Sequence, residues 1–94
     1  MVKNAGEAES FLKCVANRNR LMILCTLLDG KMSVGELNQQ VPLSQSALSQ
    51  HLSVLREADL VTTQRESQTI YYALVDERVR TLLSTLYSIF CSND

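Results

Sequence analysis

Side chains that both donate and accept hydrogen bonds recur at helical spacing in the segment LSQSALSQHLSVL. At about 100° per residue, Gln45, Ser46, Ser49, Gln50 and Ser53 fall within an arc of about 140°, and leucines occupy the opposite side. Glutamine can pair through two hydrogen bonds with the edge of adenine in the major groove, and small serines allow close approach to the backbone. This face predicts recognition of double-stranded DNA.

Two further residues join this predicted DNA-binding set. Ser44 has the position and chemistry of a helix N-cap, and helix N-termini suit phosphates. Arg65 falls at the tip of a predicted hairpin, where wings reach a neighbouring groove or phosphate. The alternative for Arg65 is a solvated turn residue, and for the polar arc a solvated helix surface. Serine is a mediocre helix former, so three serines on one exposed arc weaken the helix unless they contact something.

The charge distribution supports nucleic-acid binding only weakly. The net charge is −1, and the segment from the Ser44 cap to Gln68 has two arginines against three carboxylates. His51 lies in the middle of the apolar arc, and we interpret it as a packed or hydrogen-bonded structural histidine. The basic excess lies around the first two predicted helices, in Lys13, Arg18, Arg20 and Lys31.

Three cysteines, Cys14, Cys25 and Cys91, are the other candidates for chemistry. The sequence has no stretch long enough for a membrane span and no signal peptide, so we expect a cytoplasmic protein without a membrane partner. In that reducing compartment any cysteine pairing would be regulated or catalytic, and the alternative is a set of inert buried thiols. No base and nucleophile are arranged for catalysis, so we expect neither an enzyme nor a cofactor.

The 94 residues predict a single domain, 1–94, that is mainly α with a small β-hairpin. The second predicted helix is apolar almost all round from Leu21 to Leu28, which indicates burial at the centre of the fold. Four helices, a hairpin and a last helix form the layout of a winged helix-turn-helix. The predicted ranges are 8–16, 18–29, a short helix from 33 to 41, 44–58, the hairpin 60–74 and the last helix 76–90.

Three stretches together resemble the ArsR/SmtB family of winged-helix regulators, and within it the HlyU-type, thiol-containing branch. They are ANRNRLMILCTLL, MSVGELNQQVPLSQSALSQHLSVLREADLV and IYYAL, and the resemblance spans about Phe11 to Cys91. It implies a homodimer built from the first and last helices, with the helix 44–58 in the major groove of a pseudo-palindromic operator. The apolar positions from Val79 to Phe90 agree with such an interface.

The same resemblance implies a role for two cysteines. Cys25 and Cys91 occupy the positions of the reactive cysteines in sulfur-sensing members, where oxidants or reactive sulfur species bridge them. Bridging would move the last helix against the second. Cys14 has no counterpart in this pattern and is taken as structural. HlyU-type members are also associated with displacing a nucleoid silencer from virulence promoters.

Two alternative functions stay open. In a metal-responsive repressor of this family, thiolates would be needed at Ser33 and Gly35, and other ligands at Arg78, Ile89 and Ser92, so no metal site is expected within one subunit. A winged helix can also serve only as a protein-interaction module. Such a module would lack salt-dependent DNA binding.

Overall fold

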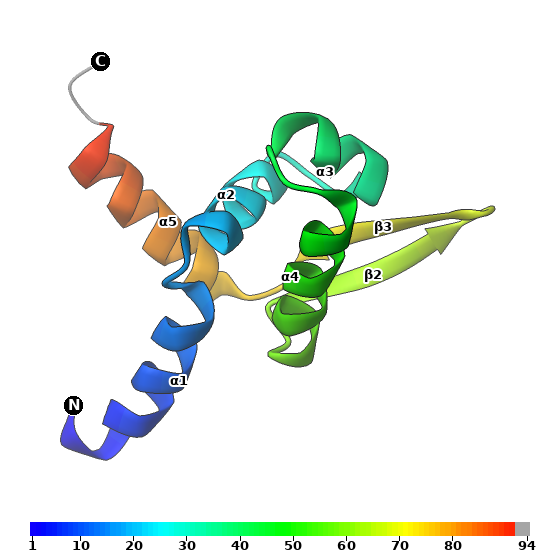
Figure 1. Cartoon of the computed structure of the whole chain (residues 1–94). Coiled ribbons are helices and arrows are strands. Elements are labelled where there is room, and N and C mark those ends of the chain that lie inside the picture. Colours follow the sequence, from blue (N-terminus) through cyan, green and yellow to red (C-terminus); the bar gives the residue numbers. More distant parts are fainter. Residues whose placement is uncertain (92–94) are drawn as a thin grey trace.

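The computed structural model describes residues 1–91 as five α-helices and a three-stranded sheet (Figure 1). This architecture confirms the predicted mainly helical, winged helix-turn-helix class. α1 starts three residues earlier than predicted, and α2 ends two residues earlier. In chain order the elements are a short 3-10 helix (Val2–Asn4), α1 (Ala5–Val15), α2 (Arg18–Leu27), β1 (Met32–Ser33), α3 (Val34–Gln40), α4 (Gln45–Glu57), β2 (Val61–Glu66), β3 (Thr69–Leu74) and α5 (Glu77–Phe90).

The sheet has one strand more than the predicted hairpin. β2 and β3 pair antiparallel along their whole length, and Ser67 takes a left-handed φ of 59° at the turn between them. β1 lies on the other side of β3, with Met32 opposite Tyr72. A strand of two residues is too short to show an alternating pattern, and its partner is distant in the sequence. The sequence therefore contained no local signal for β1.

The core is entirely apolar and is shared by all the major elements. α4 contributes Leu48, Leu52 and Leu55, each with 0% of its surface exposed, and α3 contributes Leu37. Burial of this row fixes which face of α4 points away from the body. The other buried residues are Val15, Ile23, Leu24, Leu27, Val41, Leu60, Val61, Leu74, Val79 and Leu83.

α2 is buried on one side only, which corrects the expectation that it is enclosed all round. Ile23 and Leu24 are fully buried, whereas Cys25 and Leu28 are exposed. Leu21, Cys25 and Leu28 follow helical spacing and share the face that looks toward α5. A helix without a polar face gives no sequence signal for which side packs against the core.

Short polar contacts set the angle between α3 and α4. In the turn between the two helices, the Asn38 side-chain Nδ2 donates to the Leu43 carbonyl at 2.7 Å. The Ser44 Oγ then accepts from the backbone N–H three residues on, at 3.1 Å, as predicted for the N-cap. These two bonds hold the turn at both ends.

α4 ends in a Schellman motif, in which a residue in the left-handed region follows the helix. Asp59 has a φ of 61°, and its N–H donates to the Arg56 carbonyl at 3.0 Å. The Leu60 N–H donates to the Leu55 carbonyl at 3.0 Å, and both leucines are buried. The motif directs the chain into β2 and pairs the carbonyls of Leu55 and Arg56 in the last turn of the helix.

Asp76 caps α5, and this agrees with the start of the predicted last helix at residue 76. Its Oδ1 accepts from the Arg78 backbone N–H at 2.8 Å, and its Oδ2 accepts from the Arg78 Nη2 at 2.6 Å. These bonds from Arg78 hold the pKa of the Asp76 carboxyl below its ordinary value of 3.8. A lowered folded-state pKa means that the stabilisation is complete above the unfolded-state value. It is lost as the pH falls through the folded-state pKa.

We expect Asp76→Ala to lower the free energy of unfolding by about 1 kcal/mol at pH 7, because the cap is lost. The deficit should shrink as the pH falls below 3.8, where the wild-type carboxylate itself becomes protonated. Urea unfolding at fixed protein concentration measures both quantities. Asp76→Asn is the matched control, since it keeps the cap acceptor without the charge. Equal stability of the alanine variant and the wild type at pH 7 would contradict this account.

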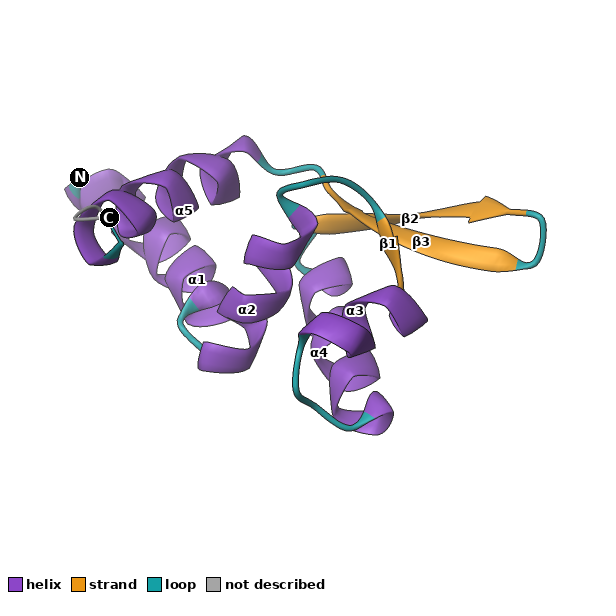
Figure 2. Ribbon diagram, turned by 90° about the horizontal axis from the view of Figure 1, so that it is seen from above, coloured by secondary structure: helices purple, strands orange, loops and turns teal. Residues whose placement is uncertain are grey.

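α1 and α5 project from the body on the side opposite the hairpin (Figure 2). The first half of α5 packs inward through Val79 and Leu83, whereas Ile89 is 63% and Phe90 76% exposed. On α1, Leu12 is 49% exposed. Both helices therefore present uncovered apolar surface. Among residues 1–91, no helix has the length and apolar character needed to cross a membrane.

Candidate functional site

The outward face of α4 presents together all the residues predicted on it. Gln45, Ser46, Ser49, Gln50 and Ser53 are exposed, on the side opposite the buried leucines. In Figure 1, α4 runs along the front of the molecule between α2 and the wing. We call these five residues the reading face. Ser44 is also exposed and stands at its N-terminal end.

Two residues on the apolar side of α4 are not packed against the core. Helical spacing predicts that Val54 and Ala58 lie on the side opposite the polar arc, but Val54 is 41% exposed and Ala58, after the end of the helix, is exposed as well. Val54 lies at the margin between the two arcs, where a small angular difference decides burial. An apolar side chain at this edge adds a surface that can contact a thymine methyl group.

The reading face is uncharged, and its field comes from the helix itself. From the Ser44 cap to Ser53 the chain has no Asp, Glu, Lys or Arg, and Arg56 and Glu57 come only at the far end of α4. A helix N-terminus carries the equivalent of about half a positive charge, together with unpaired backbone N–H groups. The end of α4 that carries most of the reading face thus favours phosphate without any basic side chain.

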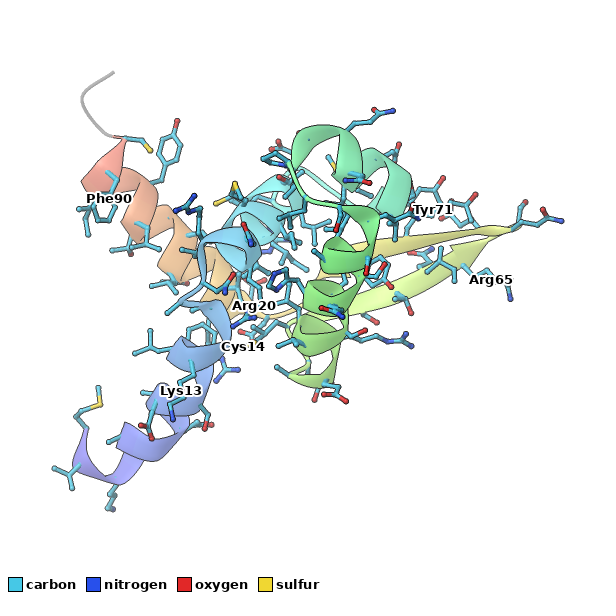
Figure 3. The ribbon with its side chains drawn as sticks, in the orientation of Figure 1. Lys13, Cys14, Arg20, Arg65, Tyr71 and Phe90 are labelled. Atoms are coloured by element: carbon cyan, nitrogen blue, oxygen red, sulfur yellow. The ribbon has the colours of Figure 1, made fainter. Side chains whose placement is uncertain are left out.

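Arg65 is exposed on β2 beside the turn and points away from the body of the molecule (Figure 3). The neighbouring Glu66 is occupied, because its carboxylate accepts from the Lys31 ammonium and from the Gln64 amide, the latter at 3.2 Å. The Lys31 Nζ also lies 5.1 Å from the centre of the Tyr71 ring. Lys31 therefore links the wing to the body and neutralises the carboxylate of Glu66, next to Arg65. Arg65 itself has no ion pair within residues 1–91.

Arg20 is turned inward rather than toward a ligand, which the sequence did not reveal. Its Nε donates to the Cys14 carbonyl at 2.5 Å and its Nη2 donates to the Lys13 carbonyl at 3.3 Å. Its Nη1 lies 3.4 Å from the His51 Nδ1 on α4. The interpretation of His51 as a hydrogen-bonded structural histidine is confirmed. In the sequence, a histidine on the apolar side of a helix indicated a hydrogen bond of this kind, but nothing identified Arg20 as its partner.

The basic residues around α1 and α2 therefore do not act as one positively charged surface. Arg20 is engaged internally, Lys31 holds the wing, and Lys13 forms an exposed pair with Glu9 at 3.7 Å. Arg18 is exposed at the start of α2. An exposed ion pair such as Lys13–Glu9 contributes little to the stability of the fold, so the Lys13 ammonium stays available to a negatively charged ligand.

Cys25 and Cys91 line the same cavity of about 680 Å³ between α2 and the end of α5. Both are free thiols, Cys25 exposed and Cys91 half-buried. The walls are otherwise almost wholly apolar, with Asp29 as their one charged group among the residues described: Leu21, Leu28, Leu83, Leu86, Tyr87 and Phe90. This volume falls within the usual range for small-molecule sites. The fold thus brings together two thiols that are far apart in the sequence.

Partial burial raises the pKa of the Cys25 thiol above 9.0, and the neighbouring Cys91 raises it further. The thiolate, which is the nucleophile, is therefore a minor species at neutral pH. We expect the rate of Cys25 alkylation by iodoacetamide to rise about tenfold per pH unit between pH 7 and 9. Peptide mass spectrometry of the reduced protein measures this rate. A rate that does not change over that range would mean that the thiolate is already formed.

Cys14 lies apart from the thiol pair. It lines a smaller cavity between α1, α5 and the C-terminal end of α4, and burial raises its pKa while Arg20 lowers it. Within residues 1–91, no three His, Cys, Asp or Glu side chains are grouped in a way that would hold a metal ion. Of the positions compared with metal sites, Ser92 lies outside the described residues.

Comparison with known proteins gives a consistent result. Residues 17–63 match the family model described as bacterial regulatory protein, arsR family. The matched segment includes α2, the helix-turn-helix and the start of the wing.

Individual relatives resemble nearly the whole chain. The transcriptional activator HlyU of Vibrio cholerae is 48% identical over 91 residues, which cover 97% of this chain and 84% of the relative. The crystal structure of the transcriptional repressor BigR from Xylella fastidiosa matches with a TM-score of 0.92 at 45% identity, covering 97% of this chain and 93% of that one. The structure of reduced HlyU from V. cholerae matches with a TM-score of 0.89 at 48% identity, covering 97% and 96%.

Proposed function

The chain belongs to the arsR family of bacterial regulatory proteins, a family of DNA-binding transcriptional regulators rather than enzymes, and on that basis we propose how it binds DNA and how it is controlled. It binds as a homodimer to a pseudo-palindromic operator. Its affinity is set by oxidation or by persulfide or polysulfide chemistry at Cys25 and Cys91. The observation that carries the proposal is the uncharged, exposed reading face on a helix whose opposite side is anchored in the core.

The reading face supports direct recognition in the major groove. Gln45 and Gln50 each offer an amide that can form two hydrogen bonds with adenine, and Ser46, Ser49 and Ser53 are short enough to let the helix approach the bases. Ser44 and the N-terminus of α4 suit a phosphate. Arg65 on the wing supplies a contact to a neighbouring groove or phosphate.

Exposed apolar surface on α1 and α5 supports a homodimer. Leu12 on α1 and Tyr87, Ile89 and Phe90 on α5 are between 49% and 76% exposed. Uncovered side chains of this size, in contiguous stretches, mark interaction surfaces. A twofold dimer presents two reading faces, which explains the proposed pseudo-palindrome and doubles every phosphate contact.

The shared cavity supports a thiol switch. The Cys25 thiolate attacks the terminal sulfur of a low-molecular-weight persulfide R–S–SH, and the thiolate R–S⁻ leaves. The Cys91 thiolate then attacks the inner sulfur of the Cys25 persulfide, forming a disulfide and releasing HS⁻. The two thiols are oxidised and the transferred sulfur is reduced. A persulfide on each cysteine gives a trisulfide by the same exchange. Either bridge holds α2 and α5 at a new distance and changes the spacing of the two reading faces.

Binding to DNA can either raise or lower transcription. One relative is an activator and another a repressor, so occupancy of DNA can lead to either result. We propose that the dimer acts in the cytoplasm by displacing a silencer from virulence promoters, as the resemblance to HlyU-type members implies. Footprinting across the genome in reduced and sulfur-stressed cells identifies the sites, and sites that never coincide with silenced promoters would contradict this mode.

Fluorescence anisotropy at increasing salt tests the DNA-binding proposal. An operator selected from randomised duplexes should bind more tightly than unrelated DNA, and the affinity should fall steeply with salt as phosphate contacts are screened. A module that binds only proteins would show neither effect. Equilibrium dialysis with zinc, copper(I) and arsenite tests the competing metal-responsive function. A stoichiometric metal site would replace the thiol switch.

A further inference from the structure

A single side chain joins the helix that carries Cys25 to the reading helix. The Arg20 guanidinium, in the first turn of α2, bonds to two carbonyls at the C-terminus of α1 and lies 3.4 Å from the His51 Nδ1 on α4. Arginine can only donate, so this contact is a hydrogen bond when the Nδ1 of His51 is the acceptor. In Figure 3, Arg20 lies between the end of α1 and α4.

The two ends of α2 serve two different sites. α2 is a continuous helix of 10 residues, with Arg20 near its start and Cys25 in its second half. Cys25 faces the cavity shared with α5, while Arg20 faces α1 and α4. A helix of this length moves as one body, so a displacement forced at Cys25 also changes the position of Arg20.

The core face of α4 packs through the fully buried apolar side chains of Leu48, Leu52 and Leu55. Apolar contacts have no preferred direction, whereas a hydrogen bond weakens steeply with distance and angle. Among the described residues, the Arg20–His51 contact is the one side-chain hydrogen bond between α2 and α4. It is therefore the contact whose strength depends most sharply on where α2 lies.

We propose that Arg20 is a positioning residue that transmits the state of the Cys25–Cys91 pair to the reading face through His51. In the reduced protein Arg20 holds α4 at the angle required for DNA. Bridging draws α2 toward α5, weakens the Arg20–His51 bond and releases that angle. This inference rests on the proposed thiol switch and adds the path by which the switch acts.

The test compares operator affinity before and after bridging, and the readout is the ratio of the two affinities. Glutathione persulfide is the reagent, and mass spectrometry confirms that the Cys25–Cys91 bridge is complete in each sample. His51→Leu removes the acceptor while keeping an apolar side chain against the core. His51→Gln restores an acceptor through its amide oxygen. Arg18→Gln removes one charge from the same helix without touching the link.

In the wild type, bridging should lower affinity at least about tenfold, within the usual range of coupling between sites. The ratio should fall below about twofold in His51→Leu, recover to at least about fivefold in His51→Gln and equal the wild-type ratio in Arg18→Gln. If circular dichroism shows that His51→Leu is not folded, Arg20→Met, which removes the donor of the same contact, takes its place in the comparison.

Two results would overturn the inference, and they are distinguishable. A wild-type ratio near one at full bridging removes the thiol switch and the inference with it. A wild-type ratio of at least about tenfold that persists unchanged in folded His51→Leu or Arg20→Met leaves the switch intact and shows that Arg20 does not transmit it. A variant that binds the operator more weakly in its reduced state, but keeps the wild-type ratio of affinities before and after bridging, also gives the second result.

Discussion

Gln50→Ala is expected to weaken specific operator binding by about 1–3 kcal/mol, which is about 5- to 150-fold in Kd. Gln50 is exposed on α4 next to Ser46 and Ser49, with the helix anchored behind it by Leu48 and Leu52. Removal of its amide leaves the adenine edge without partners in a desolvated groove, and that loss is not recovered by water in the same geometry. Gln45→Ala should have an effect of the same size for the same reason.

Anisotropy titrations on the selected operator and on an unrelated duplex separate recognition from general affinity. The alanine substitution should lower mainly the specific affinity, because the neutral glutamine amide adds nothing to the salt-dependent attraction between basic side chains and phosphates. Gln39→Ala, at an exposed glutamine on α3, is the matched control and should leave the ratio of specific to nonspecific affinity unchanged. Wild-type operator binding by both Gln45→Ala and Gln50→Ala would show that the reading face does not contact bases.

Cys91→Ser is expected to abolish the response of DNA binding to persulfide. The wild-type affinity should fall at least about tenfold on treatment, within the usual range for coupled sites, whereas the affinity of the variant should change by less than about twofold. The physical reason is that Cys25 can still accept sulfur but has no second thiol in the cavity with which to close a bridge. Cys25→Ser should lose the response as well, because it removes the first nucleophile.

Cys14→Ser is the control for this series, since Cys14 is a half-buried thiol on α1 outside that cavity. It should respond to persulfide as the wild type does. Reduced-state affinity should be unchanged in all three serine variants, because none of the cysteines lies on the reading face. A Cys91→Ser protein that still responds fully would show that modification of Cys25 alone controls binding.

Local sequence was enough to predict most of the elements and the reading face. Ser44 and Asp76 are caps whose chemistry depends only on the next two or three residues. The leucine spacing on α4 likewise fixes which face is buried, whatever it packs against. These features could be predicted because each depends on residues within a few turns of one another. Val54, at the margin of the apolar arc, and Ala58, at the end of the helix, were the exceptions.

Features that depend on distant residues were not predictable. The exposure of Cys25 depends on which side of an apolar helix meets the core, and α2 offers no polar face to decide it. Arg20 and Lys31 look like ordinary surface charges in the sequence, yet one bonds to His51 and the other to Glu66 on the wing. Only the fold brings these pairs together.

The proximity of Cys25 and Cys91 has the same origin. The resemblance to the family implied that the two approach each other, and the structure places both on one cavity. Their reactivity is not high by default, because the raised pKa of Cys25 keeps most of it protonated at neutral pH. The selectivity of the reaction would then come from the presence of Cys91 beside Cys25 rather than from an unusually low pKa of the Cys25 thiol.

The most direct test of the whole account is an affinity titration of the wild-type chain on its selected operator, before and after conversion to the Cys25–Cys91 bridge. Mass spectrometry establishes complete bridging, and dithiothreitol reverses it. We predict salt-sensitive, specific binding by the reduced protein, at least about tenfold weaker binding by the bridged protein and full recovery on reduction. Equal affinity of the reduced and fully bridged forms would contradict the account.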